Sequence, residues 1–369
     1  MKLGSKIKLL MISSNADLGG GPKQMFSLGT NLHDNFEVFY ALPKNNNYLL
    51  YLNSKNYVEI SKRKINIKDV FNLIRFIQKN NIQIIHAHGK GAGVLSRITN
   101  LFLQKKLIYT FHGIHIKCHS FFTNCIYLIY ENVFGRFDSH KIFVGESEKL
   151  YAKRSNVFFS NNISVINNGV ENKLLKEKKT YLGNSQDKKN IPRINVISVC
   201  RFVEQKNIKD ILKIAKRIPE IDFKIVGYGK LWKDIKQLIL ELDIENVQLI
   251  GMQKNVFKFL YYADVFLSTS LYEGLPLSIL EAMSVGLPII ASDVVGNKDT
   301  IENGISGYLY DLKDLSIPIK YLRELALNEK LRNLMGHNSF KRQRKFFSKQ
   351  KMISKYENLY TNVLMDLNF

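Results

Sequence analysis

The sequence has few cysteines and no long hydrophobic run. Its three cysteines, Cys118, Cys125 and Cys200, suit neither a disulfide framework nor a zinc site in number or spacing. No window approaches the roughly 20 apolar residues that a membrane-spanning helix needs. The apolar run near the N-terminus is too short for a signal peptide and leads directly into Asn15 and Asp17. We therefore expect the protein to work in a reducing cytoplasm.

Several nucleotide-binding and metal-binding motifs are also missing. There is no Asp-x-Asp, no Gly-x-x-x-x-Gly-Lys-Ser/Thr, no Gly-x-Gly-x-x-Gly, and no histidine pair spaced with a carboxylate for a metal site. A metal-chelated nucleotide-sugar mechanism, a P-loop kinase and an ordinary NAD enzyme are therefore all disfavoured. We expect neither a metal nor a cofactor.

Acidic residues are scarce beside basic ones, since 32 Asp and Glu stand against 54 Lys and Arg and give a net charge of +22. The charge either reflects a coding bias in a chain rich in Lys, Asn and Ile, or serves anionic substrates or a membrane. No nucleic-acid-binding signature is present, so we expect no nucleic-acid partner. We predict peripheral attachment to the inner face of the plasma membrane through the aromatic stretch at 121–137, with an aromatic core helix as the alternative. Basic residues are dense at 61–64 and 341–351, and the aromatic stretch contains or precedes Arg136, Lys141, Lys153 and Arg154.

The chain consists of two halves built alike. In each half, continuous apolar runs alternate with helical patterns, which predicts parallel sheets covered by helices on both faces. Each half is therefore expected to be a doubly wound, Rossmann-like α/β domain. The apolar runs are 7–13, 36–42, 82–88, 106–113 and 140–145 in the first half, and 194–202, 223–229, 247–251, 264–270 and 287–293 in the second.

We place the first domain at 1–172 and the second at 193–347, with a polar linker at 173–192 between them. Residues 348–369 are expected to form a helix that returns to the first domain. Two such domains should face each other across a cleft at the carboxyl ends of their strands, where ligands of open α/β sheets bind.

The segment YEGLPLSILEAMSVGLPIIASD at 272–293 carries two glutamates in an apolar background. Glu273 should lie in the loop after a buried strand, just before a helix that Pro276 can open. Gly286 should end that helix. Glu281 lies about two turns further on, and its side chain leans back toward the N-terminus. Carboxylates accept hydrogen bonds from hydroxyls, so the pair fits a ribose or a sugar, with two surface helix residues as the alternative.

Two cations follow the first strand of the second half. Arg201 and Lys206 straddle a loop beside a helix N-terminus, an arrangement that suits a diphosphate. A solvated loop with two cations is the alternative. Gly227 and Gly229 follow the next strand, where the backbone can approach a ligand.

In the first half, Gly20 and Gly21 lie in a glycine-rich run that predicts an exposed turn ahead of a helix. His112 lies between an apolar strand and a glycine, which favours a place in the cleft. We expect His86, by contrast, to be a buried residue that supports the site.

The stretch EGLPLSILEAMSVGLPIIASDVVG at 273–296 strongly resembles the signature of glycosyltransferase family 4. The members of this family are retaining enzymes with the two-domain GT-B fold. The resemblance extends over most of the chain, through the glycine-rich run, HAHG, TFHG, VINNGV at 165–170, IVGYG and ISGYLY at 305–310. The chain departs from the family at Cys200, where glycine is common, and at Pro22–Gln24, where many members have an acidic residue.

The resemblance implies a role for each site residue. Arg201 and Lys206 should hold the nucleotide diphosphate and offset charge on the leaving group. Glu281 should bind the ribose hydroxyls, and Glu273 should contact hydroxyls of the donor sugar. His112 should lie beside that sugar. The other expected donor-binding residues are Gly20, Gly21, Gly227, Gly229, Gly274, Leu275, Pro276 and Leu277.

The resemblance thus implies a retaining, metal-independent hexosyltransferase. It should move a sugar from a nucleotide-diphosphate donor, expected to be a UDP-sugar, to a hydroxyl of a glycan or polyprenyl-linked acceptor in O-antigen, capsule or lipopolysaccharide biosynthesis. The second domain should bind the donor and the first the acceptor. Two alternatives remain, a nucleotide-sugar epimerase or glucan synthase-type enzyme of the same fold, and a non-catalytic protein that binds anionic polymers or membranes.

Overall fold

The computed structural model describes residues 6–15, 19–44, 56–62, 64–114, 121–157, 162–174 and 193–366. Cys118, Asp17 and most of the expected linker, residues 175–192, lie outside these ranges. The chain divides into two compact units, Met1–Asn168 with Gln350–Phe369 (unit 1), and Gly169–Lys349 (unit 2).

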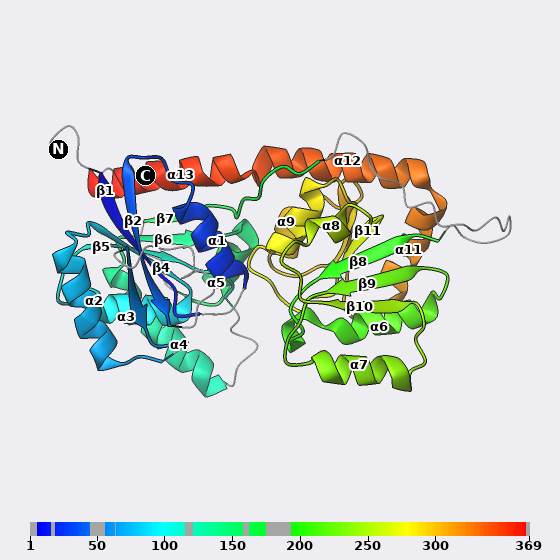
Figure 1. Cartoon of the computed structure of the whole chain (residues 1–369), viewed down its shortest axis with the longest axis horizontal. Coiled ribbons are helices and arrows are strands. Elements are labelled where there is room, and N and C mark those ends of the chain that lie inside the picture. Colours follow the sequence, from blue (N-terminus) through cyan, green and yellow to red (C-terminus); the bar gives the residue numbers. More distant parts are fainter. Residues whose placement is uncertain are drawn as a thin grey trace. The chain divides into compact units, whose positions relative to one another are not determined.

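Unit 1 is built on a seven-stranded sheet in the order β3-β2-β1-β4-β5-β6-β7, in which all pairs are parallel. Helices cover both faces, with α2 and α3 on one side and α1 and α13 on the other (Figure 1). The strands are β1 (Ile7–Ile12), β2 (Phe36–Pro43), β3 (Tyr57–Ile60), β4 (Ile84–His88), β5 (Lys106–Thr110), β6 (His140–Phe143) and β7 (Ile163–Val165). The helices are α1 (Gly20–Gly29), α2 (Ile67–Lys79), α3 (Lys90–Asn100), α4 (Phe121–Phe134), α5 (Glu146–Arg154) and α13 (Lys349–Leu364), and a 3-10 turn spans Gly135–Phe137.

Unit 2 repeats this plan with a six-stranded parallel sheet in the order β10-β9-β8-β11-β12-β13. Its α6 and α7 lie on one side of the sheet and α9 on the other (Figure 1). The strands are β8 (Asn195–Val199), β9 (Asp222–Val226), β10 (Val247–Gly251), β11 (Val265–Ser268), β12 (Ile289–Ser292) and β13 (Gly307–Tyr310). The helices are α6 (Ile208–Arg217), α7 (Trp232–Glu241), α8 (Phe257–Leu260), α9 (Leu277–Ser284), α10 (Asn297–Thr300), α11 (Ser316–Leu327) and α12 (Glu329–Phe346), with a 3-10 turn at Glu204–Lys206.

The central strands are apolar throughout because both of their faces are buried. In β1, Leu9 and Met11 pack into the core beneath α1 and α13, whereas Leu10 and Ile12 pack into the core beneath α2 and α3. A strand between two helical layers has no polar face, so its sequence loses the alternation of a half-exposed strand. The two parallel sheets confirm the expected fold class.

The sequence did not reveal β3, β7 and β13. Each is only three or four residues long and lies at an edge of its sheet. Edge strands are partly exposed, and their short, mixed sequences lack the continuous apolar run that marks the central strands. These strands extend the sheets without changing their topology.

Both sheets reverse their strand order at one point, between β1 and β4 in unit 1 and between β8 and β11 in unit 2. Loops that leave neighbouring strands there diverge to opposite faces of the sheet, which opens a crevice at the carboxyl ends of the strands. The charged candidate residues of unit 2 follow β8 and β11, the two strands at its reversal, whereas Gly227 and Gly229 follow β9.

Candidate active site

The loops after β8 and β11 are joined by hydrogen bonds between their backbones and side chains. The Thr269 hydroxyl donates to the carbonyl oxygens of Lys206 (3.0 Å) and Asn207 (2.9 Å). The Leu271 amide donates to the Gln205 carbonyl oxygen at 2.8 Å. These contacts fix the two loops against each other, so the side chains that they carry are held in place.

An ion pair between Lys206 and Glu273 lies at the centre of this junction. The side chains are 13% and 7% exposed respectively, and the Gln205 side-chain amide lies 3.4 Å from the second carboxylate oxygen. A buried carboxylate needs such partners because desolvation disfavours its charge. The sequence placed both residues at the site but did not predict that they bind each other.

Arg201 differs from Lys206 in its surroundings. Its half-buried guanidinium makes no hydrogen bond or ion pair with any residue in the described ranges. A planar group with five N–H donors is thus available to an anion. The neighbouring Cys200 is not a nucleophile, because burial raises the pKa of its thiol to about 12.

Glu281 lies on α9. Both glutamates are buried, since Glu281 is 5% exposed and Glu273 is 6% exposed. The helix begins at Leu277, with Pro276 as an extended N-cap residue and no side-chain cap. Pro276 thus stands at the start of the helix, as expected, with an extended ψ of 115°. The predicted end is confirmed, since the amides of Gly286 and Leu287 bond back to the carbonyls of Met283 and Ala282.

The loop after β12 also contributes to the site, and the sequence analysis missed it. The Glu273 amide donates to the Val295 carbonyl oxygen at 3.2 Å. Gly296 has φ 86°, and a Cβ there would overlap the Gly274 carbonyl oxygen and lie 2.9 Å from the Glu273 Cβ. The signal that could have revealed it is a glycine close behind a strand that neighbours β11.

Gly227 and Gly229 are needed because neighbouring backbone atoms leave no room for a side chain at either position. A Cβ on Gly227 would overlap the Cys200 carbonyl oxygen, and one on Gly229 would lie 2.6 Å from the Phe202 carbonyl oxygen. Both glycines let the loop after β9 pack against the loop that carries Arg201. Their contact with a donor stays a prediction.

In unit 1, the expected glycine-rich turn is a helix. Gly20 and Gly21 are the first two residues of α1, and Gly19 is its N-cap. The expectation of an exposed turn is wrong because the helix starts two residues before Pro22, which still lies in the first turn. The small size of Gly21 matters all the same, since a Cβ there would lie 3.4 Å from the His112 ring.

His112 is held by a second histidine at the ends of β4 and β5. Its Nε2 lies 3.0 Å from Nδ1 of His88, and the two rings are stacked with centroids 5.3 Å apart. Burial lowers the pKa of His112 to about 4. His86 is fully buried between Tyr360 and Thr110, each 2.7 Å from a ring nitrogen, as expected of a supporting residue.

Comparison with known proteins identifies the family of the chain. Residues 18–173 match the family model Glycosyltransferase Family 4, and residues 183–342 match Glycosyl transferases group 1. Together the two matches span most of the chain. The chain belongs to this family of glycosyltransferases. The family resemblance of the 273–296 stretch is thereby confirmed.

Two curated relatives match over most of their length. UDP-Gal:alpha-D-GlcNAc-diphosphoundecaprenol alpha-1,3-galactosyltransferase of Escherichia coli is 28% identical over 318 residues, which cover 81% of this chain and 80% of the relative. Capsular polysaccharide biosynthesis glycosyltransferase CapM of Staphylococcus aureus is 26% identical over 313 residues, covering 81% and 82%. Among solved structures, Anabaena Alr3699/HepE in complex with UDP and glucose has a TM-score of 0.81 at 16% identity, covering 96% of this chain and 99% of that chain. This likeness supports the GT-B fold.

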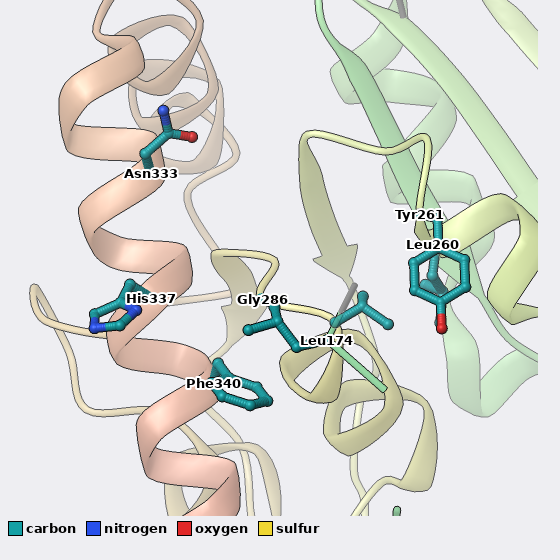
Figure 2. A pocket seen from close by; sticks show the side chains of 8 residues that line it. Leu174, Leu260, Tyr261, Gly286, Asn333, His337 and Phe340 are labelled. Carbon is teal, nitrogen blue, oxygen red and sulfur yellow. The ribbon is translucent and has the colours of Figure 1, made fainter. Parts of the chain in front are cut away.

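A cavity within unit 2 lies away from these residues. About 160 Å³ in volume, it lies between α12 and the C-terminal end of α9 (Figure 2). His337, Asn333 and Phe340 line it from α12, and Gly286 and Leu174 lie opposite. Because Glu273 precedes the N-terminal end of α9, the cavity lies at the other end of the helix from the site.

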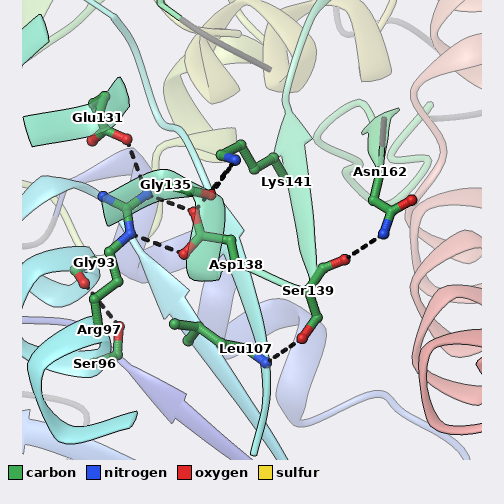
Figure 3. A network of polar contacts seen from close by, with 10 residues as sticks. All are labelled: Gly93, Ser96, Arg97, Leu107, Glu131, Gly135, Asp138, Ser139, Lys141 and Asn162. Carbon is green, nitrogen blue, oxygen red and sulfur yellow. Dashed lines mark hydrogen bonds and ion pairs between the residues drawn. The ribbon is translucent and has the colours of Figure 1, made fainter. Parts of the chain in front are cut away.

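One member of the expected basic membrane patch is not on the surface. Lys141 is 1% exposed and donates to the Gly135 carbonyl oxygen at 2.5 Å. It belongs to a buried network in which Arg97 binds Glu131 (2.9 Å) and both carboxylate oxygens of Asp138 (2.9 and 2.6 Å) (Figure 3). The prediction for Lys141 is wrong because its ammonium is needed to complete this network under α4.

The described parts of the glycosyltransferase contain no group of three or more His, Cys, Asp or Glu side chains that could hold a metal ion. Within the same ranges, no helix combines the length and apolar character needed to cross a membrane.

Proposed function

We propose that this glycosyltransferase moves a hexosyl group from a UDP-sugar to a hydroxyl of a glycan or polyprenyl-linked acceptor, with retention of anomeric configuration. The observation that carries the proposal is the pair of cations after β8. Lys206 is held by buried Glu273, and Arg201 has no partner among the described residues. An arginine with no polar partner in the described ranges, at the reversal of an α/β sheet, suits a diphosphate.

Each side chain then has a part in donor binding. The Arg201 guanidinium binds phosphate oxygens in bidentate fashion. The Lys206 ammonium has three donors, so it keeps its bond to Glu273 while a second N–H reaches the diphosphate. Glu281 accepts hydrogen bonds from the ribose hydroxyls and Glu273 from the hydroxyls of the sugar. His112 donates to an oxygen of the transferred sugar.

Fixed cations lower the barrier of the hard step, departure of the nucleoside diphosphate. The bond between the anomeric carbon and the phosphate oxygen breaks as the acceptor oxygen bonds to the same face of that carbon. The acceptor hydroxyl gives its proton to the departing phosphate oxygen. Arg201 and Lys206 stabilise the charge on this oxygen in a preorganised, partly dry site, without a metal.

The curated relatives favour a role in the assembly of cell-surface polysaccharide. The Escherichia coli relative is named for UDP-Gal as donor and a diphosphoundecaprenol-linked sugar as acceptor. Others are named for capsular polysaccharide and O-antigen biosynthesis. We extend this role to the present chain.

Arg201→Met tests the proposal without removing a hydrogen bond or ion pair to any described residue. Isothermal titration with UDP should show roughly 10- to 100-fold weaker binding, the loss expected for charge-assisted hydrogen bonds. The thermal midpoint without ligand should not change, because no described residue depends on the guanidinium. Release of UDP from UDP-galactose and UDP-glucose should fall in parallel.

The matched control is Arg193→Met. Arg193 precedes β8, at the opposite end of the strand from Arg201, and its exposed side chain pairs with Asp222 at 3.0 Å. This variant should bind UDP like the parent protein. Equal UDP affinity in the Arg201 variant and the parent would refute the assignment.

A second part of the proposal is attachment to an anionic bilayer through the outer face of α4. Phe122, Ile126 and Ile129 are 79%, 69% and 63% exposed and follow one another at helical spacing along one face. The opposite face is anchored by the hydrogen bond that Glu131 accepts from the Arg97 guanidinium (Figure 3). The exposed cations Arg136, Lys153 and Arg154 follow α4 in the chain and complement anionic lipid.

Co-sedimentation with vesicles of phosphatidylcholine and phosphatidylglycerol tests this attachment. Binding should fall when salt is raised, and the double variant Ile126→Gln/Ile129→Gln should bind several-fold more weakly. Leu240→Gln, which replaces an equally exposed apolar residue on α7, is the control. Absence of binding at low salt would refute the attachment.

A further inference from the structure

The histidine pair at the ends of β4 and β5 has a feature that donor binding does not explain. His88 is buried, and its only contact through a ring nitrogen within the described ranges is the 3.0 Å bond from Nδ1 to Nε2 of His112. Its other nitrogen, Nε2, is buried without a hydrogen-bond partner among the residues that the structure describes. His88 therefore uses its single polar contact to hold His112.

The hydrogen-bond pattern determines where the protons are. A neutral imidazole has one N–H donor and one bare nitrogen acceptor. A buried N–H without an acceptor is rarer and more costly than a buried lone pair without a donor. The proton of His88 is thus on Nδ1, where it has a partner, rather than on Nε2, where it has none.

This assignment fixes the tautomer of the partner. If His88 donates through Nδ1, then Nε2 of His112 must be the acceptor, and the proton of His112 must be on Nδ1. That Nδ1 makes no hydrogen bond with a described residue and so remains available to a substrate. Burial lowers the pKa of both histidines, which keeps the two rings neutral around pH 7.

We infer that His88 is a positioning residue that holds His112 as the Nδ1–H tautomer, so that His112 presents a neutral N–H donor to a substrate oxygen. The inference deepens the proposed function and rests on its assignment of His112 to the sugar. It excludes His112 as a cation or as a general base through Nδ1, since that nitrogen carries the proton. In this arrangement His112 recognises a hydroxyl or ring oxygen and does not exchange its proton with it.

The support for His88 extends to the C-terminal helix. The His88 ring lies against that of His86, with centroids 4.0 Å apart. His86 is fixed in turn by Thr110 on β5 and by Tyr360 on α13, each at 2.7 Å. Gly21 on α1 also lies beside His112 and leaves just enough room for the ring. The orientation of His112 thus depends on neighbours from four segments of unit 1.

Nitrogen NMR of the histidine-labelled protein tests the tautomer directly and needs no substrate. The signals of His112, assigned by their absence in His112→Ala, should show a protonated Nδ1 and a bare Nε2. His88→Asn should keep this pattern, because the asparagine amide nitrogen is attached at the same position as Nδ1. His88→Leu should give a mixture of tautomers. His140→Leu, which removes another buried histidine of unit 1, should leave the pattern unchanged.

Kinetics separate positioning from a merely structural role. In release of UDP from UDP-galactose and UDP-glucose, His88→Leu should lower kcat/KM by roughly tenfold, the loss that one hydrogen bond of ordinary strength supports. His88→Asn should restore most of it. In the His112→Ala background, His88→Leu should have no further effect, since its action passes through His112.

Two results would overturn the inference. One is a wild-type protein whose His112 carries its proton on Nε2. The other is an equal loss from His88→Leu with and without His112, which would mark His88 as structural only. Normal turnover in His112→Ala, with the tautomer as assigned, would instead refute the proposed role of His112 in sugar binding.

Discussion

The Lys206–Glu273 ion pair gives the sharpest test of how the site is built. Lys206→Met removes the ammonium but keeps a long apolar side chain, so it leaves no large cavity. Glu273 then remains buried, with the Gln205 amide at 3.4 Å and without its cation. The variant therefore isolates the cost of an uncompensated buried carboxylate.

The expected loss of stability follows from the burial of the pair. Removing one partner of a buried ion pair costs about 3–5 kcal/mol. The side chains are 13% and 7% exposed, so solvent screens the pair slightly and the lower end applies. We expect a loss of about 3 kcal/mol, or a thermal midpoint about 6–12 °C lower for a unit of roughly 180 residues. Lys206→Met/Glu273→Leu removes both charges and should return to within about 1 kcal/mol of the parent.

Intrinsic fluorescence reports on this unit alone. Trp232 is the only tryptophan in the chain and lies on α7 of unit 2. Its ring packs against Phe202, with centroids 4.9 Å apart, in the loop that carries Arg201 and Lys206. Thermal unfolding followed by tryptophan emission therefore measures unit 2 while unit 1 stays silent.

Lys213→Met is the control, because Lys213 has the same kind of partner in an exposed setting. It pairs with Asp210 at 2.8 Å, but its own side chain is 59% exposed. Surface pairs contribute about 1 kcal/mol or less, so the midpoint should hardly move. Equal shifts in the Lys206 and Lys213 variants would refute the reasoning, as would a double variant no more stable than Lys206→Met.

Three further predictions concern other parts of the molecule. Burial lowers the pKa of His140 to about 4 in the folded state. As pH falls, His140 therefore takes up its proton in the unfolded chain before it does so in the folded protein. The contribution of neutral His140 to the free energy of unfolding is complete above about pH 6.5. It is lost between about pH 6.5 and pH 4, by up to about 1.4 kcal/mol per pH unit. His140→Gln should flatten this dependence of the urea midpoint measured by circular dichroism. Gly296→Ala should destabilise unit 2 by about 2 kcal/mol or more, because φ of 86° is strained for alanine and the new Cβ would overlap the Gly274 carbonyl oxygen; tryptophan emission on heating measures this. Arg97→Met leaves two buried carboxylates without their main cation and should lower the unfolding free energy of unit 1 by about 3–5 kcal/mol, measured in urea by circular dichroism.

Much of the fold could be predicted because the central strands have continuous apolar sequences. A strand such as β1, buried on both faces, cannot carry polar residues, and the helices between strands must carry an apolar stripe. The end of α9 was equally predictable, since Gly286 ends the helix and Pro288, two residues later, keeps it from continuing. Short edge strands such as β7 were missed because they are partly exposed and impose little on the sequence.

The contacts between residues of the candidate site were harder to predict from the sequence. The pattern indicated that Lys206 and Glu273 belong to one site, because each follows a strand at the same edge of a sheet. That they pair with each other depends on how the loops after β8 and β11 fold together, 67 residues apart in the chain. Gly296 was missed for the same reason, since its close approach to Gly274 involves two different loops.

The sequence by itself determined the order of the central strands and of the helices between them, the two parallel sheets, the family, and which residue types lie at the strand ends. The strands, helices and sheets follow from local propensity and from the period of apolar residues, and the family follows from the resemblance of the 273–296 stretch to its signature. Only the tertiary structure decided that Lys141 is buried under α4 instead of facing a membrane, and that His88 holds His112. The reason is physical: a charge or a ring nitrogen has its effect through the partner it meets, and that partner comes from a distant part of the chain.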